Sequence, residues 1–446
     1  MRPDRTAVYA AAGSTGAAAR RRIDPAGRSR AVSLLHYRGG ALHLEGVALA
    51  AVAGRFGTPC YVYSRAAIEA AYRAYDEAFG NRPHRVCYAV KANSNLAVLN
   101  VLARLGAGFD VVSGGELARV LRAGGQASRV VFSGVGKRVD ELRAALAAGI
   151  ACFNVESAAE LGRLNAVALD MGRVAPVALR VNPDVDAGTH PYISTGLKTN
   201  KFGIPADQAR ALYRHAASLP GLAVHGVACH IGSQLTDLAP LREAAGRIAA
   251  LRAELEADGI AIGHVDLGGG LGIAYRDEVV PSHAEYVAAI SAPFDGSGVE
   301  ISIEPGRSIV GPAGVLLTRV EHLKPGAERN FAIVDAAMND LMRPALYDAW
   351  HGVLPLRETS GETQTWELVG PVCESGDFLA HSRSLALAEG DLLALRDAGA
   401  YGFAMSSNYN TRPRPPEVMV DGERAHLIRA RETLDDLWRG EVVLAD

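Results

Sequence analysis

Between about residues 85 and 310, short apolar runs alternate with segments of helical periodicity. Each run ends in polar or glycine-rich residues, which is typical of a buried strand followed by a loop. In the segments at 113–125 and 137–149, apolar residues recur at helical spacing before a glycine, which predicts amphipathic helices. The eight runs are VCYAV (86–90), GFDVVS (108–113), VVFSG (130–134), CFNVE (152–156), VALRVNP (177–183), VHGVACHIGS (224–233), HVDLGGG (264–270) and EISIEPG (300–306).

Strands that alternate with helices predict a parallel sheet, because parallel neighbours need crossover connections and these are right-handed. Eight such units in about 225 residues favour a TIM-like (β/α)8 barrel. A doubly wound open sheet shows the same alternation. It stays as the alternative, because barrel closure cannot be read from the sequence.

The flanking segments have a mostly β pattern. SLLHYRGGALHLEG (33–46) predicts a hairpin about its Gly-Gly pair. We expect a (β/α)8 domain at 61–311 and a C-terminal β domain, a sandwich or barrel, at 312–446, which the strands of 33–60 join. Its strands are predicted within FAIVDA (331–336), TWELVGPVC (365–373), GDLLALRDAGAYG (390–402) and PEVMVDGERAHLIRAR (416–431), where Asp421-Gly422 is a hairpin signal.

Composition narrows the class of protein. The 446 residues are 49% hydrophobic and 21% charged, with a net charge of −3, which argues against nucleic acid or an acidic membrane as a partner. No apolar run approaches the roughly 18 residues of a membrane span. The five cysteines form no CxxC pair, so we expect no disulfide framework, no metal site and a cytoplasmic location. Residues 1–32, rich in Ala, Gly and Arg, are expected to form a disordered basic tail.

Polar residues at the ends of the apolar runs suggest an active site, because barrel enzymes place it at the carboxyl ends of their strands. Lys91, His230 and Glu304 lie at such ends. There, partial desolvation would lower the pKa of Lys91 and make it an amine nucleophile. Gly268–Gly270 would offer backbone N–H groups to a phosphate. An amine, a phosphate site, a flat ring and a carboxylate are what pyridoxal phosphate requires.

Several motifs carry a specific resemblance. YAVKAN, HIGSQ, GGGLGI, EPGRSIV, CESGD and GAYG occur in this order, and together they resemble the fold-type III pyridoxal-phosphate decarboxylases of basic amino acids. The segments 180–204 and 399–418 are similar to the bacterial branch that acts on meso-2,6-diaminopimelate. The resemblance runs from about residue 34 to the C-terminus. It implies an alanine-racemase-like fold, a (β/α)8 barrel followed by a β domain, with pyridoxal 5'-phosphate as cofactor.

The resemblance also implies a role for each matching residue. Lys91 would bond to the cofactor, His230 would stack on its ring, and Glu304 would pair with the ring nitrogen. Cys373 would protonate the product and, with Glu374, would come from the second subunit of a homodimer. The cofactor site would comprise Lys91, His230, Ser233, Gly268, Gly269, Gly270, Glu304, Gly306, Arg307 and Tyr401.

The far end of the substrate separates the members of this family. A substrate that ends in both a carboxylate and an ammonium needs guanidinium and acidic partners together. We therefore expect decarboxylation of meso-2,6-diaminopimelate to L-lysine and CO2, the last step of lysine biosynthesis. The residues expected to bind it are Arg307, Arg343, Tyr347, Glu374 and Tyr401.

Three alternatives stay open at this point. A decarboxylase of ornithine, carboxynorspermidine or a carrier-bound amino acid would share Lys91 and Cys373 but would have little need for Arg343 with Glu374. A racemase would need a second base on the opposite face of the cofactor. A non-catalytic cofactor carrier of this kind would lack the β domain.

Overall fold

A computed structural model describes residues 34–186 and 201–445 of the chain. The tail expected at 1–32 lies outside the described residues, as does the centre of the motif at 180–204. Among the helices that the structure describes, none combines the length and the hydrophobicity needed to cross a bilayer.

The eight apolar runs form eight parallel strands that close into a barrel. Each strand pairs with the next along the chain, and the last pairs with the first. The (β/α)8 prediction is confirmed, and the open sheet is excluded because its two edge strands would not pair. The barrel strands are β5 (His84–Ala89), β6 (Gly108–Val111), β7 (Val130–Phe132), β8 (Cys152–Val155), β9 (Ala175–Asn182), β11 (Leu222–Ala228), β12 (His264–Asp266) and β13 (Glu300–Ile303), with the short β10 (Ile204–Pro205) beside β9.

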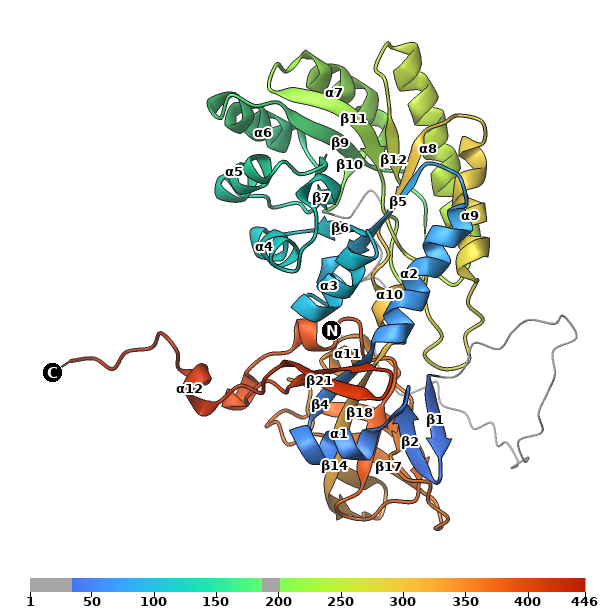
Figure 1. The fold of residues 1–446 in the computed structure, drawn as a ribbon, viewed down its shortest axis with the longest axis vertical. Coiled ribbons are helices and arrows are strands. Elements are labelled where there is room, and N and C mark those ends of the chain that lie inside the picture. The colour runs from blue at the N-terminus through green and yellow to red at the C-terminus, as the bar shows by residue number, and fades with distance from the viewer. Residues whose placement is uncertain (1–33, 187–200, 446) are drawn as a thin grey trace, which may run out of the picture. The chain divides into compact units, whose positions relative to one another are not determined.

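Helices flank the barrel strands (Figure 1). The two predicted helices are present as α4 (Gly114–Arg122) and α5 (Val139–Ala148). Helix α4 begins where the Ser113 hydroxyl accepts a hydrogen bond from the backbone N–H of Glu116, which satisfies a group that the helix leaves unpaired. The others are α2 (Arg65–Phe79), α3 (Leu96–Arg104), α6 (Ala158–Asp170), α7 (Ala206–Ser218), α8 (Ala239–Ala257), α9 (His283–Ser291) and the short α10 (Arg307–Val310).

The rest of the chain forms a second, largely antiparallel sheet. Its central strand β14 (Gly314–Lys324) was not among the predicted strands, and the predicted Asp421-Gly422 turn joins the last two strands. Its other strands are β4 (Cys60–Ser64), β15 (Asn330–Val334), β16 (Val353–Pro355), β17 (Gln364–Val369), β18 (Phe378–Leu385), β19 (Leu392–Leu395), β20 (Glu417–Asp421) and β21 (Arg424–Arg429). Two short helices, α11 (Arg343–Tyr347) and α12 (Leu434–Leu437), complete this part.

The predicted hairpin at 33–46 is confirmed as β1 (Leu35–Arg38) and β2 (Ala41–Leu44). With β3 (Val47–Ala48) it forms a separate sheet, followed by helix α1 (Leu49–Phe56). Leu42 and Leu44 belong to the same buried hydrophobic cluster as Val315 and Leu317 of β14. The hairpin therefore packs on the β domain without extending its sheet.

Glycines let the barrel and the β domain approach closely where the chain crosses between them. Gly399 lies against the segment after α10, since its N–H donates to the carbonyl of Gly311 at 3.1 Å. A Cβ added at Gly399 would lie 1.8 Å from the carbonyl oxygen of Val310. The side-chain amide of Asn93, two residues after Lys91, donates to the Gly399 carbonyl at 3.2 Å.

A Gly399→Ala variant is therefore expected to be destabilised by at least about 2 kcal/mol, because two backbone segments must separate to admit the methyl group. Thermal unfolding followed by circular dichroism measures the effect. Gly54→Ala in α1 is the matched control: no atom lies within 4 Å of its Cβ, and alanine favours a helix interior by up to about 1 kcal/mol. Equal melting midpoints for the two variants would contradict this account.

Candidate active site

Lys91 lies in a single helical turn, η1 (Val90–Ala92), directly after strand β5. Its Nζ donates to Asp110 Oδ2 on the neighbouring strand β6 at 2.6 Å, and the Asp110 side chain is fully buried. Burial by itself would lower the pKa of Lys91, but the charges of Asp110 and Glu304 outweigh it and raise the pKa above its usual value. The expected lowering of this pKa is therefore wrong for the protein alone, because the Asp110 carboxylate, 2.6 Å from Nζ, keeps the amine protonated.

Buried carboxylates gather at this end of the barrel. Glu304 follows β13, and its Oε1 accepts from Ser133 Oγ and from Asn154 Nδ2, each at 3.4 Å. Asn154 Nδ2 also lies 3.2 Å from Asp266 Oδ2. Burial, together with the charges of Asp110 and Asp266, raises the pKa of Glu304 well above its ordinary value. Glu304 therefore favours a protonated state or a cationic partner.

The loops after β11 and β12 pack tightly against each other. The N–H of Gly269 donates to His230 Nδ1 at 3.2 Å, so this nitrogen is an acceptor and the ring is neutral. Burial lowers the pKa of His230, as do the nearby charges of Arg180 and Lys91. A Cβ at Gly268 would lie 2.5 Å from His230 Nδ1, and one at Gly269 would lie 2.4 Å from the Glu304 carbonyl. Close packing therefore explains why glycine is needed at these two positions, independently of any role in binding a phosphate.

Two arginines, Arg307 and Arg343, contact Tyr275. Arg307 Nη1 donates to the Tyr275 hydroxyl at 2.7 Å, and the guanidinium of Arg343 lies 4.5 Å from the centre of the Tyr275 ring. Arg307 also donates to Ser233 Oγ, from Nη2 at 3.1 Å, and lies 5.0 Å from the centre of the Tyr401 ring. Both arginines are buried. The sequence predictions Ser233, Arg307, Arg343 and Tyr401 thus fall in one cluster, and Tyr347 lies on α11 with Arg343.

The CESGD motif lies on a loop of the β domain, and a buried residue of the motif, Asp377, holds this loop in place. The Asp377 carboxylate accepts hydrogen bonds from the N–H groups of Val372 at 2.8 Å and Met338 at 2.6 Å. The N–H of Cys373 donates to Asn410 Oδ1 at 2.7 Å. The side chains of Cys373 and Glu374 are exposed.

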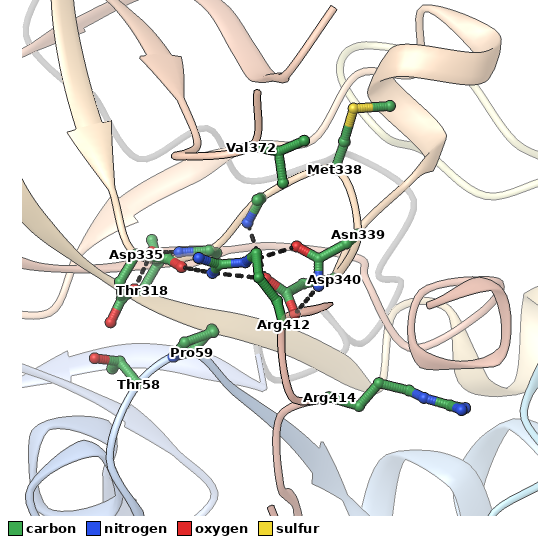
Figure 2. A network of polar contacts seen from close by, with 12 residues as sticks. Thr58, Pro59, Thr318, Asp335, Met338, Asn339, Asp340, Val372, Arg412 and Arg414 are labelled. Carbon is green, nitrogen blue, oxygen red and sulfur yellow. Dashed lines mark hydrogen bonds and ion pairs between the residues drawn. The ribbon is translucent and has the colours of Figure 1, made fainter. Parts of the chain in front are cut away.

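A polar network around Arg412 supports the two loops that meet at this motif (Figure 2). Arg412 Nε donates to Asn339 Oδ1 at 3.0 Å, and its Nη2 lies 3.8 Å from Asp340 Oδ2. Arg412 Nη2 also donates to the carbonyl of Asp335 at 2.5 Å. These contacts tie the segment that carries Asn410 to the segment that carries Met338, so the backbone of the Cys373 loop is well fixed while two of its side chains face outward.

Sequence reasoning missed several residues of the site. Three of them lie within the barrel strands: Asp110, Asn154 and Asp266. A polar residue inside an apolar run was the sequence signal that could have identified them. Tyr275 had no such signal, since it lies in a loop whose position only the fold defines. Gly306 was predicted as part of the site. A Cβ added at Gly306 would lie 2.9 Å from the Cβ of Ala92, so the glycine allows the turn of Lys91 to pack against the Glu304 loop.

The residues at this mouth fit pyridoxal phosphate. Asp110 Oδ1 and Asn154 Oδ1 are buried without a hydrogen-bond partner among the described residues. Glu304 lies in a surplus of negative charge, so a protonated ring nitrogen would provide the partner that its carboxylate favours. Lys91 would supply the amine for the cofactor's aldehyde, and Arg307 with Ser233 would supply hydrogen-bond donors for its phosphate.

Comparisons with known proteins agree with this geometry. Residues 65–311 match the family described as "Pyridoxal-dependent decarboxylase, pyridoxal binding domain". A protein named diaminopimelate decarboxylase from Pseudomonas aeruginosa is 62% identical over 408 residues, which is 92% of this chain and 98% of that protein. Its namesake from Vibrio cholerae is 60% identical over 91% of this chain and 98% of its own length.

Solved structures give the same result. The diaminopimelate decarboxylase of M. jannaschii, in complex with L-lysine, superposes with a TM-score of 0.88 at 40% identity, covering 92% of this chain and 98% of its own. The enzyme of Helicobacter pylori, also complexed with L-lysine, gives a TM-score of 0.85 at 42% identity over 88% and 98% of the two chains. The chain thus belongs to the pyridoxal-dependent decarboxylases, in the diaminopimelate decarboxylase family.

Proposed function

We propose that this protein decarboxylates meso-2,6-diaminopimelate to L-lysine and CO2, the step that completes lysine biosynthesis, with pyridoxal phosphate held by Lys91. Its relatives at 52–62% identity carry the name of this activity. Two related structures contain L-lysine, the product expected of the reaction.

The pair of buried guanidiniums around Tyr275 is the observation that carries the choice of substrate. One phosphate and one distal carboxylate would provide anionic partners for both Arg307 and Arg343. Ornithine ends in an ammonium group, which two arginines would repel. The same fold occurs in the lysine/ornithine decarboxylase of Vibrio vulnificus, with a TM-score of 0.74 at 25% identity, so the fold alone does not select the substrate.

When bound, pyridoxal phosphate supplies an electron sink for the carbanion left by the loss of CO2. The protein would contribute three things. Glu304 would keep a proton on the ring nitrogen, Arg343 would hold the distal carboxylate of the substrate, and Cys373 would donate a proton to the reacting carbon. Lys91, whose amine Asp110 keeps protonated in the protein alone, would hold the cofactor at the mouth of the barrel.

We also propose that the active unit is a homodimer in which each site takes Cys373 and Glu374 from the partner. Both side chains are exposed, and the N–H of Cys373 donates to Asn410 of its own β domain. A fixed loop with outward-facing reactive side chains suits a contribution to a second chain.

The cysteines of the described residues are all free thiols, which supports a reducing, cytoplasmic location.

The first experiment is turnover of purified protein loaded with pyridoxal phosphate. We expect L-lysine and CO2 from meso-diaminopimelate and no product from the LL-isomer or from ornithine, because only the D-configured centre is expected to lose its carboxylate. Lysine and CO2 are measured directly. Turnover of ornithine, or a cofactor-loaded protein that leaves the meso isomer unchanged, would refute the proposed substrate.

Arg343→Ala is expected to raise the KM for meso-diaminopimelate about 30-fold or more, the loss expected for hydrogen bonds to a charged group worth about 2 kcal/mol. The cofactor absorbance should stay, since Arg343 is assigned to the distal end of the substrate. Competitive inhibition provides the sharper comparison. L-Lysine retains a distal carboxylate and cadaverine lacks it, so the variant should weaken inhibition by lysine only. Arg122→Ala, at an exposed position of α4, is the control, and equal behaviour of the two variants would exclude the role of Arg343.

Lys91→Ala and Cys373→Ala test whether the sites are shared. Each homodimeric variant should be nearly inactive, the first for lack of the cofactor link and the second for lack of the proton donor. A heterodimer isolated through two different affinity tags should recover about half of the native activity, because one of its two symmetric sites contains both native residues. A heterodimer as inactive as its parents would show that each chain completes its own site.

A further inference from the structure

Arg343 is held in the site by a histidine that the sequence did not suggest. Arg343 begins helix α11, and its Nη1 lies 2.8 Å from Nε2 of His351, four residues beyond Tyr347, the last residue of that helix. Both side chains are buried, and His351 is 0% exposed. The His351 ring also meets the Tyr275 ring edge-on, with centroids 5.5 Å apart. Arg343, Tyr275 and His351 therefore form one packed unit.

The hydrogen bonds of His351 determine which of its nitrogens carries the proton. Its Nδ1 lies 2.7 Å from the carbonyl oxygen of Arg396, which can only accept, so Nδ1 is the donor. A guanidinium has no acceptor, so Nε2 must be the unprotonated nitrogen that receives the Arg343 N–H. Burial, with the Arg343 charge beside the ring, lowers the pKa of His351 to about 3. The ring is therefore a neutral acceptor near neutral pH.

His351 is itself fixed by its surroundings. Arg383 Nη2 donates to the His351 carbonyl at 2.9 Å, and the Arg383 guanidinium lies 3.2 Å from the centre of the Trp350 ring. The N–H of Arg396 donates to the carbonyl of Gly352 at 2.8 Å. Through its two ring nitrogens and the backbone carbonyls of residues 351 and 352, the histidine segment thus connects α11 to the end of strand β19 and to Arg383.

A neutral acceptor affects Arg343 differently from a carboxylate. Among the residues that the structure describes, no ion pair joins Arg343 to an acidic side chain, although the guanidinium is buried. A carboxylate partner would neutralise the charge and compete with an anionic ligand. The histidine occupies one N–H and fixes the plane of the guanidinium without placing a carboxylate against it; the charge of Arg343 acts only over a longer distance on buried Asp397.

We propose that His351 is a positioning residue for the reaction, which orients Arg343 toward the distal carboxylate of the substrate and leaves its charge available to that carboxylate. The proposal rests on the proposed role of Arg343. It predicts that His351 affects only ligands that carry the distal carboxylate, since Arg343 is the group through which it acts.

Two substitutions separate the bonds of His351. In His351→Gln the side-chain oxygen takes the place of Nε2, so the acceptor for Arg343 is retained and the bond to Arg396 is lost. In His351→Asn the amide takes the place of Nδ1, so the bond to Arg396 is retained and the acceptor for Arg343 is lost. The holoenzyme is assayed for kcat and for the KM of meso-diaminopimelate, and for inhibition by L-lysine and cadaverine.

We expect His351→Asn to raise the KM and the lysine inhibition constant about tenfold, the loss expected for one hydrogen bond to a charged group. Its kcat and its inhibition by cadaverine should stay within about twofold of native, and His351→Gln should resemble the native enzyme. In an Arg343→Ala background, His351→Asn should cause no further loss, because the residue acts through the arginine.

The outcomes distinguish this proposal from the proposed function. If Arg343→Ala leaves the preference for lysine over cadaverine unchanged, the role of Arg343 fails. If Arg343→Ala abolishes that preference and His351→Asn does not alter it, only the role of His351 fails. Equal losses for both ligands in the Asn and Gln variants would indicate a structural role and overturn the proposal. Should the Asn variant not fold, His351→Ala with added imidazole replaces it, and imidazole must restore the preference for lysine.

Discussion

The turn that carries Lys91 is fixed from two sides, and the rest of the site depends on this constraint. On the barrel side, Lys91 donates to buried Asp110 at 2.6 Å. On the side of the β domain, the N–H of Tyr401 donates to the carbonyl of Ala92 at 2.8 Å, and Asn93 donates to the carbonyl of Gly399. Both parts of the chain therefore hold the three-residue turn that presents the amine at the mouth, and a Cβ at Gly399 would lie 1.8 Å from the carbonyl oxygen of Val310 at this crossing.

Charge is divided across the mouth. Asp110, Asp266 and Glu304 lie at the barrel strands, where their mutual repulsion and burial raise the pKa of Glu304. Arg307 and Arg343 lie around Tyr275. A ligand with a cationic ring nitrogen at one end and anionic groups at the other would complement both regions. Lys91 pairs with Asp110, but among the described residues no ion pair balances Glu304, Arg307 or Arg343, which is a cost in folding stability that bound ligands would offset.

The β domain contributes more than a cover for the barrel. It supplies Arg343, the histidine that holds it, and the loop of Cys373, whose backbone is anchored through Asp377 and Asn410. These groups lie on segments of the β domain, and Arg343 and His351 also pack against Tyr275 in the loop after barrel strand β12.

The alternation of apolar runs and helical segments determined the eight strands, because strand and helix periodicities are local properties of the chain. The rule that strands end at one rim then brought Lys91, His230 and Glu304 together from the sequence alone. The partners of these residues were decided only by the tertiary structure. Asp110 reverses the expected shift in the pKa of Lys91, and His351 meets Arg343 through a turn whose shape no local pattern encodes. Burial and charge act through space, so their sign at a given residue follows from the closed barrel and the β domain that packs on it.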